Sequence, residues 1–182
     1  MSLSARLAAA ALLMAATPAL PQASRDADSR ERAWLAAHNA ARADVGIAPL
    51  AWSERLARDA QDWAQHLART GRYGHASIDE RKGQGENLWR GPRDQWSAWE
   101  TVGFFVAERR HFRPGNFPDV SRTGHWPDVG HYTQVIWPGT REVGCALAYG
   151  GGDEVLVCRY WPAGNIWGAR IDPGGNGGEA RH

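Results

Sequence analysis

Four titratable side chains lie at positions where an apolar residue would be expected. His131 opens the apolar stretch GHYTQVIW (residues 130–137), and Glu108 lies four residues from a phenylalanine on either side. Glu86 lies between glycines and a tryptophan in GQGENLW, and His75 follows a glycine in YGHAS. Imidazole nitrogens bind Zn²⁺ and similar cations, and imidazoles and carboxylates act as general acids and bases. We therefore take these four residues as candidates for a metal or catalytic site.

Each candidate also has an explanation that involves no chemistry. A lone histidine such as His131 is often a core residue bonded to a backbone carbonyl, and Glu86 could bond to amides of its own loop. Glu108 could pair with a nearby arginine at the surface, and His75 could belong to an ordinary loop. The chain has no GxSxG, HExxH, P-loop or GxGxxG motif, so no common catalytic signature decides between these readings.

Two imidazoles and two carboxylates allow a short list of reactions. Spacing alone does not make them a site; if the fold brings them together, His75 and His131 would bind a divalent metal such as Zn²⁺ weakly, with Glu86 and Glu108 accepting hydrogen bonds from the imidazoles. Metal-assisted or His/Glu-based hydrolysis is an alternative, in which a glutamate-oriented histidine acts as general base. A nucleophilic route would need a serine such as Ser77, and nothing in the sequence places one there.

The composition is that of a globular chain with one domain. It has 182 residues, of which 43% are hydrophobic and 23% charged. The formal net charge of +1 argues against nucleic acid as a partner, because phosphate-binding domains carry a strong basic excess. Ten tryptophans supply large aromatic surfaces, which suit a core and the edges of a cleft.

Residues 1–23 have the pattern of a secretory signal. Arg6 provides the positive start, an uncharged stretch follows, and small residues at 19–23 provide possible cleavage sites. The apolar stretch is too short to span a bilayer. It also has no neighbouring cysteine that could carry a lipid anchor. We therefore expect an exported protein, periplasmic or extracellular, with no stable membrane anchor after cleavage.

The two cysteines are expected to pair. Cys145 and Cys158 lie in EVGCALAYGGGDEVLVCRYW, where two β-like runs flank the turn signal at 150–153. Hairpin pairing could bring the cysteines opposite each other, and an exported protein meets oxidising conditions. We predict a structural disulfide.

The order of elements predicts an α+β fold. Helices are expected over about 29–44, from a cap at Ser53 to Gly71, and over about 95–112, with residues 71–95 irregular. Strands are expected from His131 and around each cysteine. Helices that precede antiparallel strands favour a layer of helices packed on an antiparallel sheet. The tail at 173–182 is rich in glycine and is expected to be disordered.

Four motifs resemble one known family. GHYTQVIWPGT (130–140) and VLVCRYWPAGNIWG (155–168) resemble the two signatures of the CAP superfamily of cysteine-rich secretory, venom antigen 5 and plant pathogenesis-related proteins. HNAAR (38–42) resembles the HNxxR motif of the first helix, and GEN (85–87) matches a further element. The resemblance covers residues 29–172, and one disulfide with an alanine- and arginine-rich signal suggests a minimal, bacterial member.

The resemblance implies an α-β-α sandwich with a central antiparallel sheet and an open cleft. In that cleft His75, Glu86, Glu108 and His131 match the family's two histidines and two acids, which implies a weak site for Zn²⁺ or another divalent metal. The ligand would be a small extracellular lipid, sterol, glycan or peptide, bound by a monomer between aromatic edges such as Trp89, Trp126 and Tyr132. A non-catalytic scaffold, in which the four residues form a buried polar network, is a further reading.

Overall fold

The computed structural model describes residues 22–173, with side chains from residue 26 onward. The predicted signal segment 1–23 and tail 173–182 therefore lie almost entirely outside the described residues. The helices are α1 (Gln22–Ala43), α2 (Glu54–Thr70), α3 (Ile78–Arg81), α4 (Ala98–Ala107) and α5 (Gly130–Val135), with 3₁₀ turns η1 (Glu108–His111) and η2 (Trp126–Val129). The strands are β1 (Ala51–Trp52), β2 (Gly85–Pro92), β3 (Gly115–Asn116), β4 (Glu142–Gly150), β5 (Asp153–Trp161) and β6 (Arg170–Ile171).

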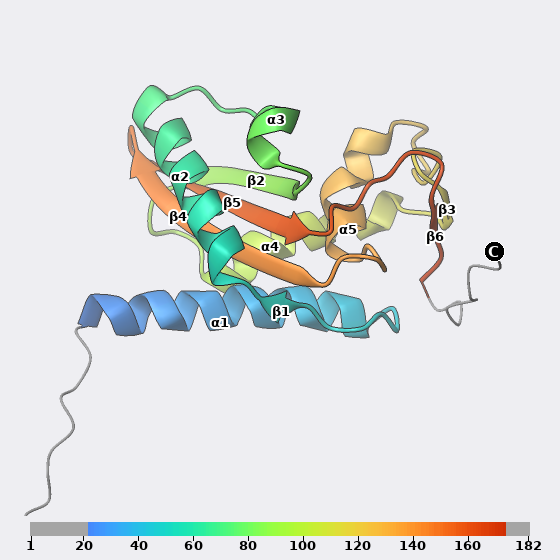
Figure 1. Cartoon of the computed structure of the whole chain (residues 1–182), viewed down its shortest axis with the longest axis horizontal. Helices are drawn as coiled ribbons and strands as arrows, with labels where there is room; N and C mark the ends of the chain where they lie inside the picture. Colours follow the sequence, from blue (N-terminus) through green and yellow to red (C-terminus); the bar gives the residue numbers. More distant parts are fainter. Residues whose placement is uncertain (1–21, 174–182) are drawn as a thin grey trace, which may run out of the picture.

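The central sheet has the strand order β1-β4-β5-β2 (Figure 1). Its three long strands are antiparallel, and the two-residue β1 adds a parallel pairing at the β4 edge. The β4–β5 hairpin turns at 150–153 and sets Cys145 directly opposite Cys158, and the two are joined by a disulfide. The predicted hairpin and disulfide are therefore confirmed.

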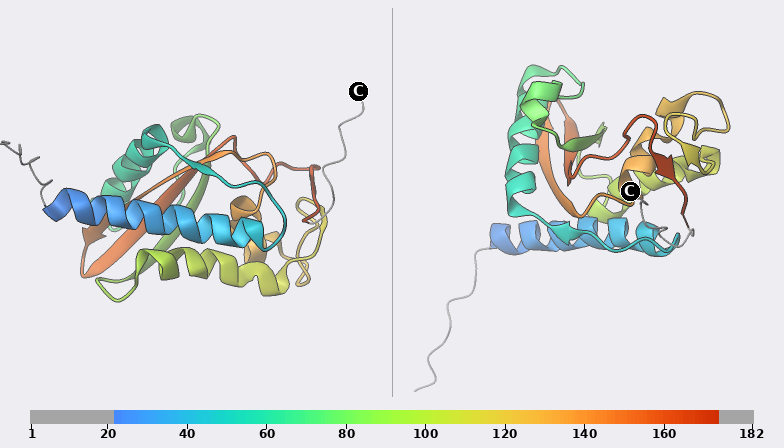
Figure 2. Two further views of the ribbon diagram at one scale, coloured as in Figure 1. Left: turned by 90° about the horizontal axis from the view of Figure 1, so that it is seen from below. Right: turned by 45° about the vertical axis from the view of Figure 1, so that its right-hand side comes forward.

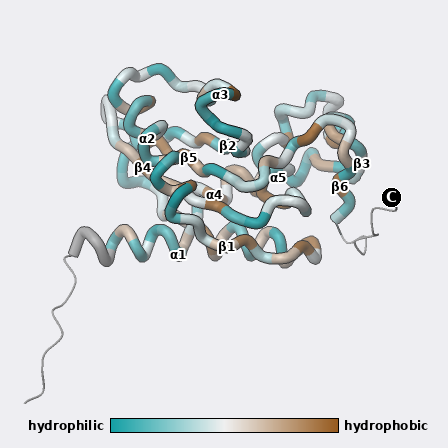
Figure 3. Tube along the Cα trace, in the orientation of Figure 1, coloured by the Kyte–Doolittle hydropathy of each residue, from teal (hydrophilic) through white to brown (hydrophobic). Residues whose placement is uncertain are grey.

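Helix α2 covers one face of this sheet. Its buried residues Leu56, Ala60, Ala64 and Leu67 recur at helical spacing, and the last three pack on buried side chains of β2, β4 and β5. Figure 3 shows α2 as mainly hydrophilic with hydrophobic interruptions, which is the pattern of a helix with one buried stripe. Gly71 ends the helix in the left-handed conformation, with φ of 67°, as the sequence predicts.

Helices α1 and α4 cover the opposite face and lie side by side (Figure 2). Trp34 of α1 and Val102 and Phe105 of α4 belong to one buried cluster that also includes Cys145 and residues of β5. The Trp34 Nε1 atom donates to the Thr101 Oγ1 atom at 3.2 Å and joins the two helices. The result is the expected α-β-α sandwich.

The bounds of α1 and α4 and the structure of residues 71–95 differ from the sequence prediction. Helix α1 begins by Gln22 rather than near residue 29, because the intervening segment contains good helix formers and no proline or glycine. Helix α4 begins at Ala98, where Ser97 and Glu100 form a capping box, and it gives way to η1 at Glu108. The stretch 71–95, predicted to be irregular, contains both α3 and the edge strand β2.

The segment that begins at His131 is a helix, and the prediction of a strand is wrong. The N–H groups of His131 and Tyr132, at the start of α5, donate to the Glu108 Oε2 atom at 2.9 and 3.1 Å. At the other end, the buried Arg42 guanidinium donates to the carbonyls of Val135 and Trp137 at 2.9 and 3.0 Å. Side chains distant in sequence therefore satisfy both ends of this short helix.

Arg42 also donates to the carbonyls of Ala48 and Thr140, at 2.7 and 3.0 Å. Burial lowers the pKa of its guanidinium to about 10, so the group stays charged at neutral pH.

Across residues 22–173, we find no helix with the length and apolar character needed to cross a membrane.

Candidate functional site

A cleft of about 360 Å³ opens where the start of β2 faces α5. One wall is formed by residues 84–87 and another by α5, with 163–165 and aromatic side chains completing it. Gly85 allows the close approach of the two elements, because a Cβ atom there would overlap the Gln134 side chain of α5. Both His75 and His131 line this cleft.

Glu108 bonds to both the ring and the backbone of His131. The Glu108 Oε1 atom lies 2.6 Å from the His131 Nδ1 atom, while Oε2 accepts the backbone N–H bonds that begin α5. A carboxylate can only accept, so Nδ1 carries the proton and the Nε2 atom has the free lone pair. The His131 ring also stacks on Phe105, with ring centroids 5.1 Å apart. Glu108 itself does not line the cleft.

Glu86 holds His75 in a similar way. Its Oε1 atom lies 2.7 Å from the His75 Nδ1 atom and accepts the Ala76 N–H bond at 3.0 Å. The Glu86 side chain is fully buried, whereas the His75 side chain is 54% exposed. As with His131, the geometry assigns the proton to Nδ1 and leaves Nε2 available.

A buried arginine balances the charge of Glu86. The Glu86 Oε2 atom lies 2.9 Å from the Arg159 Nη2 atom, in an ion pair whose side chains are almost completely buried. The guanidinium is not aligned for a hydrogen bond with that oxygen, which has no other partner in the described part of the chain. Burial lowers the pKa of Arg159, and the charge of Glu86 opposes this shift.

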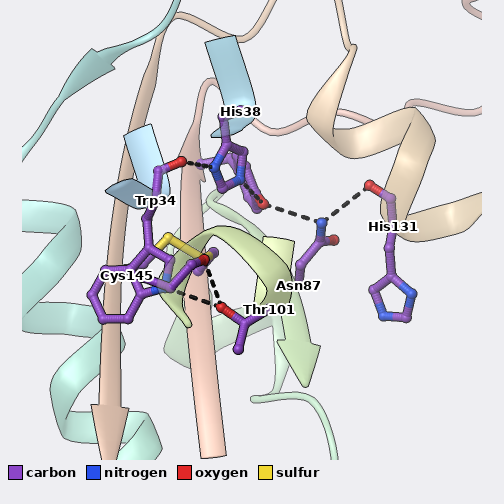
Figure 4. The surroundings of a disulfide bond; sticks show 9 residues. Trp34, His38, Asn87, Thr101, His131 and Cys145 are labelled. Carbon is purple, nitrogen blue, oxygen red and sulfur yellow. Dashed lines mark hydrogen bonds between the residues drawn. A yellow bond between two sulfur atoms is a disulfide. The ribbon is translucent and has the colours of Figure 1, made fainter. Parts of the chain in front are cut away.

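A buried hydrogen-bond chain connects α1 to His131 (Figure 4). The His38 Nδ1 atom donates to the Trp34 carbonyl at 2.8 Å, so Nε2 accepts from the Tyr160 hydroxyl, also at 2.8 Å. Asn87 donates to the Tyr160 hydroxyl and to the His131 carbonyl, both at 3.1 Å. Burial lowers the pKa of His38 to about 4, so this histidine is neutral and plays a structural part.

The structure therefore brings three of the four predicted residues, His75, Glu86 and His131, to one cleft, and the fourth, Glu108, is bonded to His131 outside the lining. Glu86 and Asn87 are neighbours in β2, so their side chains point to opposite faces of the sheet. Glu86 bonds to His75 on one face, and Asn87 bonds to the His131 carbonyl on the other. Neither His75 Nε2 nor His131 Nε2 has a hydrogen-bond partner among residues 26–173. Both imidazoles thus line the cleft with an Nε2 atom that no other side chain of the described residues engages.

The aromatic edge of the cleft differs in part from the expectation. Trp126 lines the cleft as expected, but Tyr132 is buried at 4% exposure, and Trp89 stacks on Phe104 away from it. The sequence reading missed Phe117 and Trp167, which line the cleft beside Trp126. The only available signal for Trp167 was its position in the second family signature.

The cleft offers no hydroxyl, thiol or amine nucleophile in the described part of the chain. Its lining there contains no serine, threonine, cysteine, lysine or tyrosine. The Ser77 hydroxyl instead donates to Glu80 at 2.7 Å, in the capping box of α3. The arrangement therefore suits a bound cation or an activated water, and its described lining lacks the hydroxyl, thiol or amine that a serine-, cysteine- or lysine-type covalent route needs.

The donor set fits a weakly held divalent cation. A carboxylate on the far nitrogen of a histidine is the usual arrangement behind a metal-binding imidazole. Within residues 22–173, the one group of three potential ligands that already lie together is His38, Cys145 and Cys158, and the disulfide occupies both sulfurs. His75 and His131 would thus hold a cation as two ligands, with further positions open.

Comparisons with known proteins agree with this architecture. Pathogenesis-related protein 1A of Nicotiana tabacum is 37% identical over 144 residues, which cover 78% of this chain and 80% of that protein. The structure of BmVAL-1 matches with a TM-score of 0.64 and 24% identity, covering 78% of this chain and 80% of that one. The structure of NaASP2 with Zn²⁺ matches with a TM-score of 0.63 and 22% identity, covering 79% and 84%. The model of the cysteine-rich secretory protein family matches residues 35–160, and the chain belongs to this CAP family.

Proposed function

We propose that the protein is a CAP-domain binding protein whose cleft holds a divalent cation, such as Zn²⁺, together with a small extracellular ligand. The observation that carries the proposal is the pair of imidazoles lining one cleft, each bonded through Nδ1 to a glutamate. A fold-related protein, NaASP2, has been solved with Zn²⁺. His75 and His131 would hold the ion through their Nε2 atoms.

The glutamates orient the rings and keep the proton on Nδ1, so that each Nε2 lone pair faces the cleft. A bound cation would supply Lewis acidity and attract a ligand with oxygen or nitrogen donors. Two protein ligands hold a metal less tightly than the four of a closed structural site, so binding would be weak and reversible.

Calorimetric titration of Zn²⁺ at pH 7.5 and pH 5.5 tests this site. Protons compete with the metal for the imidazole nitrogens, so the affinity should fall on acidification. His75→Gln and His131→Gln should each abolish most of the binding, whereas His66→Gln, on α2 and outside the cleft lining, should not. Equal affinity at both pH values, or in all three variants, would contradict the proposal.

Hydrolysis is the second candidate function, and the His–Glu pairs are the observation that favours it. An imidazole held by a carboxylate can accept a proton from water, and no covalent step on the protein is needed. Turnover of peptide or ester substrates by the wild type should then be lost in Glu86→Ala and Glu108→Ala. Activity that survives both substitutions would come from another source.

We also propose that the protein is exported. The signal-like sequence of residues 1–23 and the Cys145–Cys158 disulfide support this location. Full-length protein expressed in bacteria should be recovered from the periplasm or medium with a mass that corresponds to cleavage between residues 19 and 23. Recovery of uncleaved protein from the cytosol would contradict it.

A further inference from the structure

Arg81 is a cationic residue of the cleft without a counterion. It is the last residue of α3, it is partly buried, and it lines the cleft on the same side as His75. Its Nε atom is buried and has no hydrogen-bond partner, and the guanidinium makes no ion pair within the described part of the chain. A guanidinium without partners in a cleft is available to a ligand.

The nearby carboxylates are engaged elsewhere. Glu86 is bonded to His75 and Ala76 and paired with Arg159, as described above. Glu80 is held in its capping box by Ser77, and Asp59 accepts from Gln84 at 2.6 Å. None of these three carboxylates is paired with Arg81, so its guanidinium lines the cleft without a bonded counterion among the described residues.

Part of the cleft lining is aromatic. Trp126 and Trp167 both contact Phe117 edge to face, with ring centroids 5.2 and 6.1 Å apart. Phe117 is buried, whereas Trp126 is 37% exposed and Trp167 is 70% exposed. These two indoles present apolar ring surface directly beside the polar part of the cleft.

We propose that Arg81 forms an anion subsite, which binds a carboxylate or other oxyanion of the ligand while a ring of the same ligand lies against Trp126 and Trp167. The planar guanidinium matches a carboxylate, sulfate or phosphate through two parallel hydrogen bonds. This inference rests on the proposed binding role of the cleft and specifies its ligand as an acidic ring compound. Both an aromatic acid and an acidic sugar have this chemistry.

Two matched pairs of probes test the subsite. Phenylacetate is compared with 2-phenylethanol, and glucuronate with glucose, so that each pair differs in the carboxylate. Binding is followed by NMR shifts of the indole N–H signals, in EDTA and again with Zn²⁺. The acid of at least one pair should bind about tenfold or more tightly than its neutral partner, as expected for a charge-assisted bond. The pair that responds identifies the source of the acid.

Substitutions assign the effect to one guanidinium. Arg81→Gln should weaken binding of the acid about tenfold and leave the neutral probe unchanged, while Arg81→Lys should recover part of the loss. Arg141→Gln, an exposed position outside the cleft, is the matched control and should bind like the wild type. Circular dichroism melts confirm that each variant is folded.

Equal binding of acid and neutral probe, or equal affinity in wild type and Arg81→Gln, would overturn the subsite. Loss of Zn²⁺ binding does not affect this test, because the measurement in EDTA needs no metal. If Zn²⁺ fails to bind but Arg81 still selects the acid, the metal proposal fails and the anion subsite is supported. If Zn²⁺ binds but Arg81→Gln has no effect on the acid, the anion subsite fails and the metal proposal is supported.

Discussion

Glu108 and His131 are joined by two bonds of different kinds. One carboxylate oxygen accepts from the imidazole Nδ1 atom at 2.6 Å, and the other accepts the backbone N–H of the same residue at 2.9 Å. A single glutamate thus fixes both the ring and the main chain that carries it. This double attachment links the direction of the cleft imidazole to the start of α5.

Glu108→Gln should weaken Zn²⁺ binding by about 10- to 100-fold, because the amide has only one oxygen to replace these two acceptors. The stability should also fall by about 1–3 kcal/mol, since buried N–H groups lose their partner. Calorimetry and urea unfolding measure the two effects. Glu142→Gln, on a partly exposed glutamate of β4, is the control and should change neither value much.

Acid should destabilise the fold through His38. Burial lowers its pKa from the usual 6.5 to about 4, so between these values the unfolded chain binds a proton that the folded chain does not. The free energy of unfolding should therefore fall as the pH drops from 6.5 to 4, by up to about 3 kcal/mol from this group. Urea unfolding across this range measures the slope, which should be reduced in His38→Gln. An unchanged slope in the variant would contradict the assignment.

Removal of the Cys145–Cys158 disulfide should lower stability by about 3 kcal/mol, because the bond closes a short loop between residues 13 apart. For a chain of this size the melting temperature should fall by about 10 °C in the Cys145→Ala/Cys158→Ala variant. Both cysteines lie in the core away from the cleft, so the folded variant should bind Zn²⁺ like the wild type. A melting temperature that does not change on reduction would contradict this account.

The packing of α2 on β4 depends on Gly144. A Cβ atom at this position would lie 2.6 Å from the Ser53 carbonyl oxygen and would overlap the backbone of Ala57, neither of which can move alone. Gly144→Ala should therefore destabilise the protein by about 1–3 kcal/mol or more. Gly103→Ala is the matched control, because Gly103 lies in α4 with open space around its Cβ position. That change should stabilise the helix by about 0.5–1 kcal/mol, and urea unfolding compares the two.

Features that depend on local sequence were predictable. The disulfide hairpin follows from two β-like runs around a glycine turn, and α2 follows from one apolar stripe that ends at Gly71. The helix α4 was predicted from about residue 95, although the spacing of Ser97 and Glu100, a capping box, marks its start at Ala98. These signals lie within a few residues of the structure they specify.

The conformation of α5 was not predictable in this way. Its β-branched and aromatic residues favour a strand by propensity, and the segment is too short for its periodicity to decide. The helix is selected by Glu108 at one end and Arg42 at the other, which lie 23 and 93 residues away from their partners. Such tertiary contacts override the local preference.

The candidate residues themselves were identified from their unusual positions and matched by the family motifs, but their pairing was not predicted. We expected the imidazoles to donate to the glutamates, but the sequence did not indicate that His75 would bond to Glu86 and His131 to Glu108. The place of Arg81 and Trp167 in the cleft was equally hidden, because it depends on how loops from separate elements meet.

The dependence of α5 on Arg42 and Glu108 makes the direction of one cleft imidazole a property of the assembled molecule. Release of α1 alone would withdraw Arg42 and leave the helix without its terminal partner, while the covalently linked hairpin stayed intact. A partly folded chain would thus carry the sequence of the site without its function. Transplanting residues 126–140 into another scaffold would fail for the same reason, unless both anchoring side chains were moved with them.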